Sequence, residues 1–291
     1  MVIGAEPYQS RVLAPLPIIN DQIELSNPDQ TRIARARQLT EFGLRDQAAL
    51  ELQSLAVLDP KKSSDRAKLS SSTLLHLIRE LSASGLYLTS FTLIDPILQR
   101  SDESLYHRPI VELIYPTDQF TTISSQGEKN GLDPLFVLSL MKQESGFEGQ
   151  ILSRVGAEGL MQLMPYTGRE VYGKVFGSPS AVERRDFLQP ELNVTLGTAY
   201  LKQLSERYNG NGAMMLAAYN AGPARMDSWK KSGIAERGFL EFVEQIPFSE
   251  TRGYVARIFR NYVYYKALRE NVLVQIPDDR SSERKHPFWN R

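Results

Sequence analysis

The sequence predicts a mainly α-helical protein, and two features of its 291 residues support this. From about residue 31 to 98, and again from about 118 to 270, most segments carry apolar side chains at the period of a helix. Almost no segment shows the two-residue alternation that is typical of a half-buried strand. A chain of this length can form one large domain or two ordinary ones, each with its own core.

Residues 1–30 contain several prolines and no clear period, so we expect a tail or extended arm there. Residues 31–117 predict α-helical hairpins, because a helix–Gly–helix pattern occurs twice. The four expected helices are marked by apolar positions in 33–42, 48–55, 75–81 and 88–94, with Gly43 and Gly85 in corresponding places. Two such hairpins either end a longer helical array or form an ordinary helical subdomain, and both alternatives stay open.

The charge balance argues against a nucleic-acid partner. Lys plus Arg and Asp plus Glu each number 34, so the formal net charge is zero. A nucleic-acid-binding protein usually carries a basic excess or a basic patch, whereas a neutral polymer such as a glycan fits this balance better. The chain has no cysteine and only three histidines, His76, His107 and His286, all far from the motifs below. We therefore expect no metal site, no Ser-His-Asp triad and no cofactor.

No stretch approaches the ~18 apolar residues of a membrane span, so we expect none. The first twenty residues lack the basic start and continuous apolar run of a secretory signal. Residues alone therefore do not separate a mature or truncated exported protein from a cytoplasmic one. Residues 276–291 predict a charged tail.

The first motif with chemical potential lies in a helix that we expect to begin near Pro134. Every residue of 135–141 except Ser139 is apolar, which predicts a buried core helix. Glu144 follows Val137 by seven positions, so its carboxyl falls on an apolar stripe, where burial would raise its pKa as a general acid requires. Periodicity alone favours the alternative that Glu144 is the first solvated residue at the helix end.

The second motif, 153–165, reads SRVGAEGLMQLMP. Gln162 is a neutral amide that both donates and accepts hydrogen bonds, and it lies close to the flexible thioethers of Met161 and Met164. This combination suits a sugar, which offers an apolar ring face together with hydroxyl and N-acetyl groups. Taken alone, the segment would favour a Met-rich core.

Two further segments carry polar groups at helix ends. Residues 216–223 predict a small-residue helix that ends at Gly222, with Tyr219 and Asn220 in its last turn. Residues 246–254 open a tyrosine-rich helix with Glu250 in its first turn, where a carboxylate is favourable against the helix dipole. A purely structural role explains either segment on its own.

Together these segments resemble the soluble lytic transglycosylases, whose catalytic domain has a lysozyme-like fold close to that of goose-type lysozymes. The resemblance rests on four motifs in order: ES at 144–145, GLMQ at 159–162, AYNAG at 218–222 and ETRGYV at 250–255. It covers about 118–270, and it implies a catalytic domain at 118–275 preceded by the α-helical hairpins. The hairpins at 31–98 resemble the end of the superhelical region of the large members, most of which this chain lacks.

The resemblance implies roles residue by residue. Glu144 matches the catalytic acid and base, and Tyr219, accompanied by Asn220, matches the tyrosine near that carboxylate. The resemblance also implies substrate-binding positions that line the cleft and hold the N-acetyl groups at Ser153, Gln162 and Met164, and a second acid that contacts substrate at Glu250. Its implied partner is the glycan strands of peptidoglycan, and its implied location is the periplasm. The expected reaction cleaves the MurNAc–GlcNAc β-1,4 bond and forms 1,6-anhydroMurNAc, with help from the substrate's own N-acetyl group.

Two alternatives to this function stay open. A lysozyme-type glycoside hydrolase would use the same Glu144 but add water. A glycan-binding module built on helical hairpins would have no catalytic activity, so replacing Glu144 would leave cell-wall lysis unchanged.

Overall fold

The computed structural model describes residues 23–59, 68–98, 108–117, 119–178, 182–236 and 238–270. The chain divides into two compact units, Met1–Pro116 and Thr117–Arg291, which we describe separately. The expected charged tail at 276–291 lies outside the described residues, as do residues 1–22 of the expected arm. No helix in the described ranges is both long enough and apolar enough to cross a membrane.

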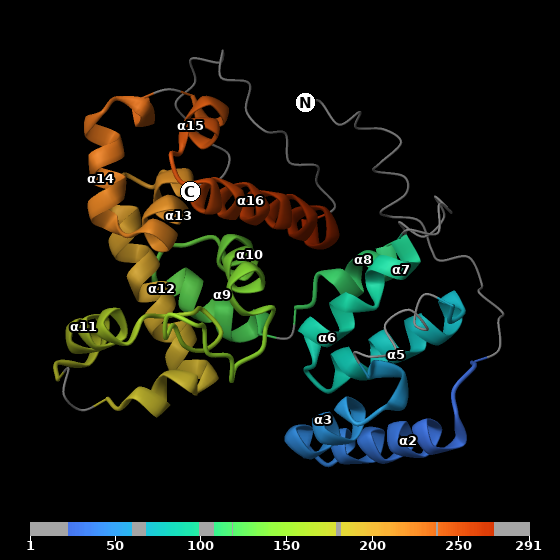
Figure 1. The fold of residues 1–291 in the computed structure, drawn as a ribbon. Coiled ribbons are helices and arrows are strands. Elements are labelled where there is room, and N and C mark those ends of the chain that lie inside the picture. Colours follow the sequence, from blue (N-terminus) through green and yellow to red (C-terminus); the bar gives the residue numbers. More distant parts are fainter. Residues whose placement is uncertain are drawn as a thin grey trace. The chain divides into compact units, whose positions relative to one another are not determined.

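Unit 1 consists of short helices in sequence-adjacent pairs (Figure 1). They are α2 Asn27–Glu41, α3 Arg45–Gln53, the 3-10 turn η1 Ala56–Leu58, α5 Ser71–Ala83, α6 Tyr87–Thr92, α7 Ile94–Leu98 and α8 Arg108–Ile114.

The two glycine turns of unit 1 have the same geometry. Gly43 and Gly85 have φ values of 74° and 80°, a region that favours glycine because it has no Cβ. In each turn the N–H of the residue after the glycine donates a hydrogen bond to a carbonyl in the last turn of the preceding helix. Leu44 donates to the Leu39 carbonyl at 2.8 Å, and Leu86 donates to the Leu81 carbonyl at 2.9 Å. The expected correspondence between these glycines therefore holds in the structure.

The first helix begins earlier than expected, so the prediction of a tail through residue 30 is wrong at its end. Helix α2 starts at Asn27, since the Ser26 hydroxyl caps it by accepting from the Asp29 N–H, and Pro28 occupies its first turn. From sequence alone, Pro28 fits the proline-containing arm equally well. At the other end, Phe42 is 79% exposed and does not extend the apolar stripe.

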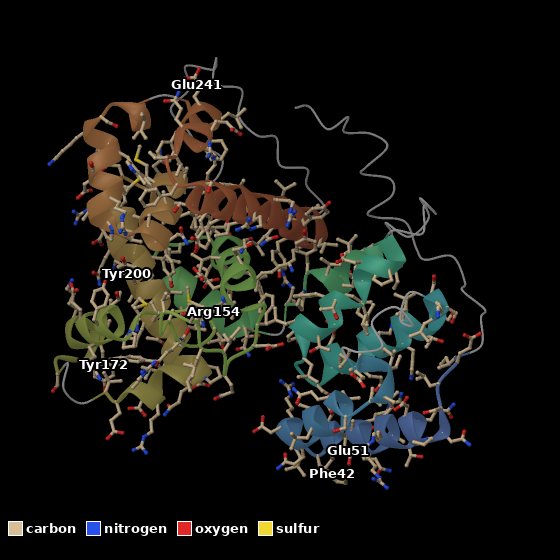
Figure 2. The ribbon with its side chains drawn as sticks, in the orientation of Figure 1. Phe42, Glu51, Arg154, Tyr172, Tyr200 and Glu241 are labelled. Atoms are coloured by element: carbon tan, nitrogen blue, oxygen red, sulfur yellow. The ribbon has the colours of Figure 1, made fainter. Side chains whose placement is uncertain are left out.

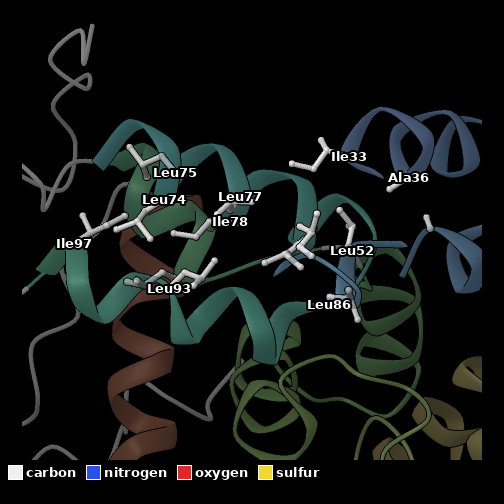
Figure 3. Close-up of a cluster of buried hydrophobic side chains, with 14 of the residues drawn as sticks. Ile33, Ala36, Leu52, Leu74, Leu75, Leu77, Ile78, Leu86, Leu93 and Ile97 are labelled. Carbon is white, nitrogen blue, oxygen red and sulfur yellow. The ribbon is translucent and has the colours of Figure 1, made fainter. Parts of the chain in front are cut away.

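Unit 1 buries its own apolar core (Figure 3). Leu52, Leu74, Leu77, Ile78 and Leu93 have no exposed surface, and they come from both glycine-linked pairs of helices. Burying aliphatic side chains from both pairs in one cluster joins the pairs into one unit.

Unit 2 is also helical, and among its described residues only two isolated bridges, Leu152–Glu158 and Glu158–Leu163, have β pairing. The mainly α prediction is therefore confirmed. Its elements are α9 Phe120–Lys129, α10 Pro134–Ser145, α11 Pro165–Phe176, η5 Arg184–Leu188, α12 Pro190–Arg207, α13 Gly212–Ala221, α14 Pro223–Lys231, η6 Ile234–Glu236, α15 Phe239–Gln245 and α16 Ser249–Glu270.

Helix α10 carries Glu144, and it packs against α9 and α16. It begins at Pro134, as predicted, because the Asp133 carboxylate caps it by accepting from the Leu135 N–H at 2.8 Å. All residues of 135–141 are buried, so the expected core helix is confirmed. It ends where Gly146 adopts a left-handed φ of 57°, which leaves Glu144 in the last turn.

Candidate active site

Glu144 is partly buried at the end of α10, facing α16. The buried Tyr254 of α16 donates its phenol hydrogen to Glu144 Oε1. Burial raises the pKa of Glu144 to about 8, and the hydrogen bond from Tyr254 only partly opposes this effect. Partial burial thus favours a neutral carboxyl, and the contact with Tyr254 argues against a solvated helix end.

Tyr219 brings a second phenol near Glu144 from α13, a helix that also packs against α16. Its hydroxyl donates to the Met161 carbonyl oxygen at 2.7 Å. The pKa of Tyr219 is raised well above its ordinary value, chiefly by burial and then by the negative charge that Glu144 carries when ionised. Both phenols beside Glu144 therefore stay neutral in the working range of the carboxyl.

The loop 151–163 supplies the carbonyl that holds Tyr219, and it also carries Ser153 and Gln162. The Gln162 amide nitrogen donates to the carbonyls of Gly159 at 2.8 Å and Ile151 at 3.2 Å. Its amide oxygen accepts no hydrogen bond from the described residues, so it can receive one from a ligand. The Ser153 hydroxyl oxygen accepts from the Ala157 N–H at 2.8 Å and keeps its own hydrogen to donate.

Gln162 has a φ of 46°, which is uncommon for a residue with a side chain. Strain of this kind persists only where surrounding contacts impose it. Asn193 of α12 provides such contacts, since it has no exposed surface and its amide accepts from the Met161 N–H at 2.7 Å while donating to the Glu158 carbonyl at 2.9 Å. The buried Glu158 carboxylate also forms an ion pair with Arg184.

Asn220 and Glu250 lie in a second group, at an open hollow of about 520 Å³. Both are exposed, and Asn220 is fixed because its side-chain oxygen accepts from the Thr251 hydroxyl at 2.6 Å. Eight residues line the hollow: Asn220, Ala221, Arg225, Pro247, Phe248, Ser249, Glu250 and Thr251. Glu144 is not among them, but Asn220 directly follows Tyr219, and Thr251 is one helical turn before Tyr254.

In the structure, the expected site residues other than Met164 therefore fall into three separate groups. Tyr219 lies with Glu144, Asn220 lies with Glu250, and Ser153 and Gln162 share one loop. Met164 directly precedes α11, and its side chain is partly buried. The described residues hold no cluster of three or more acidic or histidine side chains that could bind a metal ion.

Tyr254 and Asn193 contact the candidate site and were not predicted as site residues. Tyr254 is 110 residues from Glu144, so no local pattern links them. The only sequence feature that could have indicated Tyr254 is its position in the first turns of α16, close to Glu250. Asn193 carried no usable signal, because an Asn in a helix becomes informative only when its partners are known.

The family described as the transglycosylase SLT domain matches residues 121–238. The matched segment contains Glu144, Gln162 and Tyr219, while Glu250 and Tyr254 follow it in α16.

Two named relatives are similar to part of this chain. The chain is 38% identical over 131 residues to the soluble lytic murein transglycosylase of Escherichia coli K12, covering 45% of this chain and 20% of that protein. It is 36% identical over 141 residues to a putative soluble lytic murein transglycosylase of Haemophilus influenzae, covering 48% and 23%. The match thus spans about a fifth of the length of these relatives.

Two solved structures have the same fold. The 70 kDa soluble lytic transglycosylase of Escherichia coli superposes with a TM-score of 0.67 at 26% identity, covering 87% of this chain and 38% of that one. An inactive glutamate-to-glutamine variant of the Pseudomonas aeruginosa lytic transglycosylase Slt gives 0.59 at 28% identity, covering 84% and 37%. Coverage this high exceeds unit 2 alone, so part of unit 1 matches as well.

Proposed function

We propose that this chain is a peptidoglycan lytic transglycosylase that cleaves the MurNAc–GlcNAc β-1,4 bond and forms 1,6-anhydroMurNAc. The observation that carries this proposal is the state of Glu144: a shielded carboxyl, protonated near neutral pH, beside two neutral phenols in an SLT domain. The similarity to lytic murein transglycosylases supports the substrate class. The periplasm, where peptidoglycan lies, is part of the same proposal.

In the first step, Glu144 gives its proton to the oxygen that bridges the two sugars while the bond from that oxygen to the anomeric carbon breaks. The substrate's N-acetyl oxygen bonds to the anomeric carbon and stabilises the positive charge that develops there. A single protein carboxyl is then sufficient. Tyr254 supports this step because its hydrogen bond occupies Oε1 and leaves Oε2 of Glu144 for the transferred proton.

In the second step, the ionised Glu144 takes the proton of the carbon-6 hydroxyl, and that oxygen attacks the anomeric carbon. The bond to the N-acetyl oxygen breaks, the 1,6-anhydro ring closes, and Glu144 is protonated again. Intramolecular attack is favoured over water because the hydroxyl is already held near the reacting carbon. The phenols of Tyr219 and Tyr254 keep their protons throughout, since the pKa of each is raised well above its ordinary value.

The remaining cleft residues hold the strand in this proposal. Ser153 and Gln162 have a free donor and a free acceptor on one loop, which suits the N-acetyl groups, and Met164 offers apolar contact. Asn220 and Glu250 bind sugar hydroxyls or amides at the neighbouring hollow. An inactive relative with a glutamate-to-glutamine change supports an essential glutamate in this family.

Mass spectrometry of peptidoglycan digested by the purified chain tests this proposal. We expect products with anhydro ends, whereas reducing ends would show the hydrolase. Glu144→Gln is expected to lower the rate by at least ~10²-fold, the contribution of a general acid. Glu206→Gln, an exposed change on α12, is the matched control and should keep full activity. Unchanged lysis by Glu144→Gln would favour the non-catalytic glycan-binding module.

A further inference from the structure

Three tyrosines from successive helices form a row that leads away from Glu144. Tyr219 of α13 interacts with the charge of Glu144, and its ring lies 5.4 Å from the ring of Tyr200 on α12, centroid to centroid. The phenol of Tyr200 in turn interacts electrostatically with that of Tyr166 on α11. Helix α12 packs against both α11 and α13, so Tyr200 lies between the helices that carry Tyr166 and Tyr219. Tyr200 is labelled in Figure 2.

The outer tyrosine of this row, Tyr166, is the exposed one. Tyr219 and Tyr200 are partly buried and pack against the apolar cluster that contains Leu163 and Leu196. Tyr166 is 68% exposed and makes no ring–ring contact with the described residues. Phe176, the exposed aromatic residue at the other end of α11, is different because its ring packs against that of Tyr172, with the centroids 4.7 Å apart and the planes tilted by 43°. The outer end of the row thus presents an unstacked aromatic face to solvent.

Tyr166 lies close in sequence to Met164, which the proposed function places in the cleft. It follows Met164 by two residues, in the first turn of α11. The side chains beside it on the helix, Arg169 and Glu170, are exposed and charged. Charged residues are depleted from the cores of protein interfaces, so this surface does not fit a protein partner. A sugar ring fits it, because one face of the ring is apolar while its hydroxyls suit nearby phenol and carboxylate groups.

We propose that Tyr166 is a glycan-binding residue whose ring stacks on a sugar unit of the strand, outside the units held at Glu144. This inference rests on the proposed function and extends it, because it assigns an additional sugar-binding position at the outer end of the tyrosine row. It predicts that affinity depends on strand length. A short oligosaccharide held at Glu144 does not reach Tyr166, whereas a long one does.

Calorimetry with the intact chain tests this prediction, using N-acetylglucosamine disaccharide and hexasaccharide as probes. Tyr166→Ala is expected to weaken hexasaccharide binding roughly 3- to 10-fold, as the loss of an aromatic contact worth about 0.5–1.5 kcal/mol implies, and to leave disaccharide binding unchanged. Tyr166→Phe keeps the ring and should bind like wild type. Phe176→Ala is the matched control on the same helix and should change neither affinity.

Kinetics on purified glycan strands provide a second measurement, in which Tyr166→Ala should raise KM while kcat stays unchanged. Equal affinities of wild type and Tyr166→Ala for the hexasaccharide would overturn this inference and leave the proposed function intact. Equal weakening of both oligosaccharides would also overturn it, because that result indicates a general disturbance of the cleft. A wild-type chain that neither binds nor cleaves glycan strands would overturn the inference together with the proposed function.

Discussion

At the scale of the residue, two opposing effects set the chemistry of Glu144. Burial penalises the carboxylate and raises the pKa, while the hydrogen bond from Tyr254 stabilises the carboxylate and lowers it. Burial dominates, since the pKa is about 8. A carboxyl with this pKa is mostly protonated at neutral pH, yet it can release and regain its proton at little cost. One side chain can therefore act as both acid and base.

Removing the phenol of Tyr254 tests this balance. Tyr254→Phe deletes the hydrogen bond but keeps the buried ring, so the pKa of Glu144 should rise further. Activity depends on the protonated acid and falls as pH rises through the pKa, so the alkaline limb of the kcat/KM profile should move to higher pH. The measurement is that profile for both proteins. A limb that stays in place or moves to lower pH would contradict the role assigned to Tyr254.

At the scale of the element, the loop 151–163 is held by tight packing against α12 and η5. Gly159 has a φ of 77°, and a Cβ there would lie 2.6 Å from the Phe187 carbonyl oxygen and overlap the Asn193 amide. The glycine is thus required both by the backbone angle and by the lack of space. This close approach lets Asn193 bond directly to the loop that carries Gln162.

We predict that Gly159→Ala destabilises the protein by about 3 kcal/mol or more, from the unfavourable φ and from overpacking together. Gly177→Ala is the matched control, because Gly177 has a similar φ of 85° but open space around it. That change should cost only about 1–2 kcal/mol. Urea unfolding of both variants measures the difference. Equal losses would show that overlap with Asn193 and Phe187 does not constrain the loop.

Much of this element-level structure could be predicted from sequence because its causes are local. Pro134 and its preceding Asp133 fix the start of α10, and Gly43 and Gly85 fix the two turns of unit 1. The start of α2 was misplaced because a proline in a first helical turn looks like a proline in an arm. The pairing of Glu144 with Tyr254 was not predictable, since only the packing of α10 on α16 brings them together.

At the scale of the whole molecule, the raised pKa of Glu144 affects the stability of the folded chain as well as the proposed catalysis. Below about pH 4.5 the carboxyl is protonated in both folded and unfolded chains and has no effect. Between about 4.5 and 8 it ionises only in the unfolded chain, so the unfolding free energy decreases as pH rises, by up to about 1.4 kcal/mol per pH unit. Above about 8 the decrease stops.

Glu144→Gln removes this penalty, because glutamine does not ionise in either state. We predict that the variant is more stable than the wild type at neutral pH. Its advantage in unfolding free energy should shrink as the pH falls toward the ordinary pKa of a glutamate side chain. Urea unfolding of both proteins at several pH values measures this difference, in which the effects of all other groups cancel. A constant difference across that range would mean that Glu144 has an ordinary pKa in the folded chain.

The most direct test of the account is a titration of the Glu144 carboxyl itself in the ligand-free protein. Carbon-13 labelling of the glutamate side chains, with Glu144→Gln to assign the signal, gives its pKa by NMR. We predict a midpoint at about 8. A midpoint near 4.5, the ordinary value for glutamate, would contradict the account, because the side chain would then be ionised at neutral pH with no proton to give to the bridging oxygen.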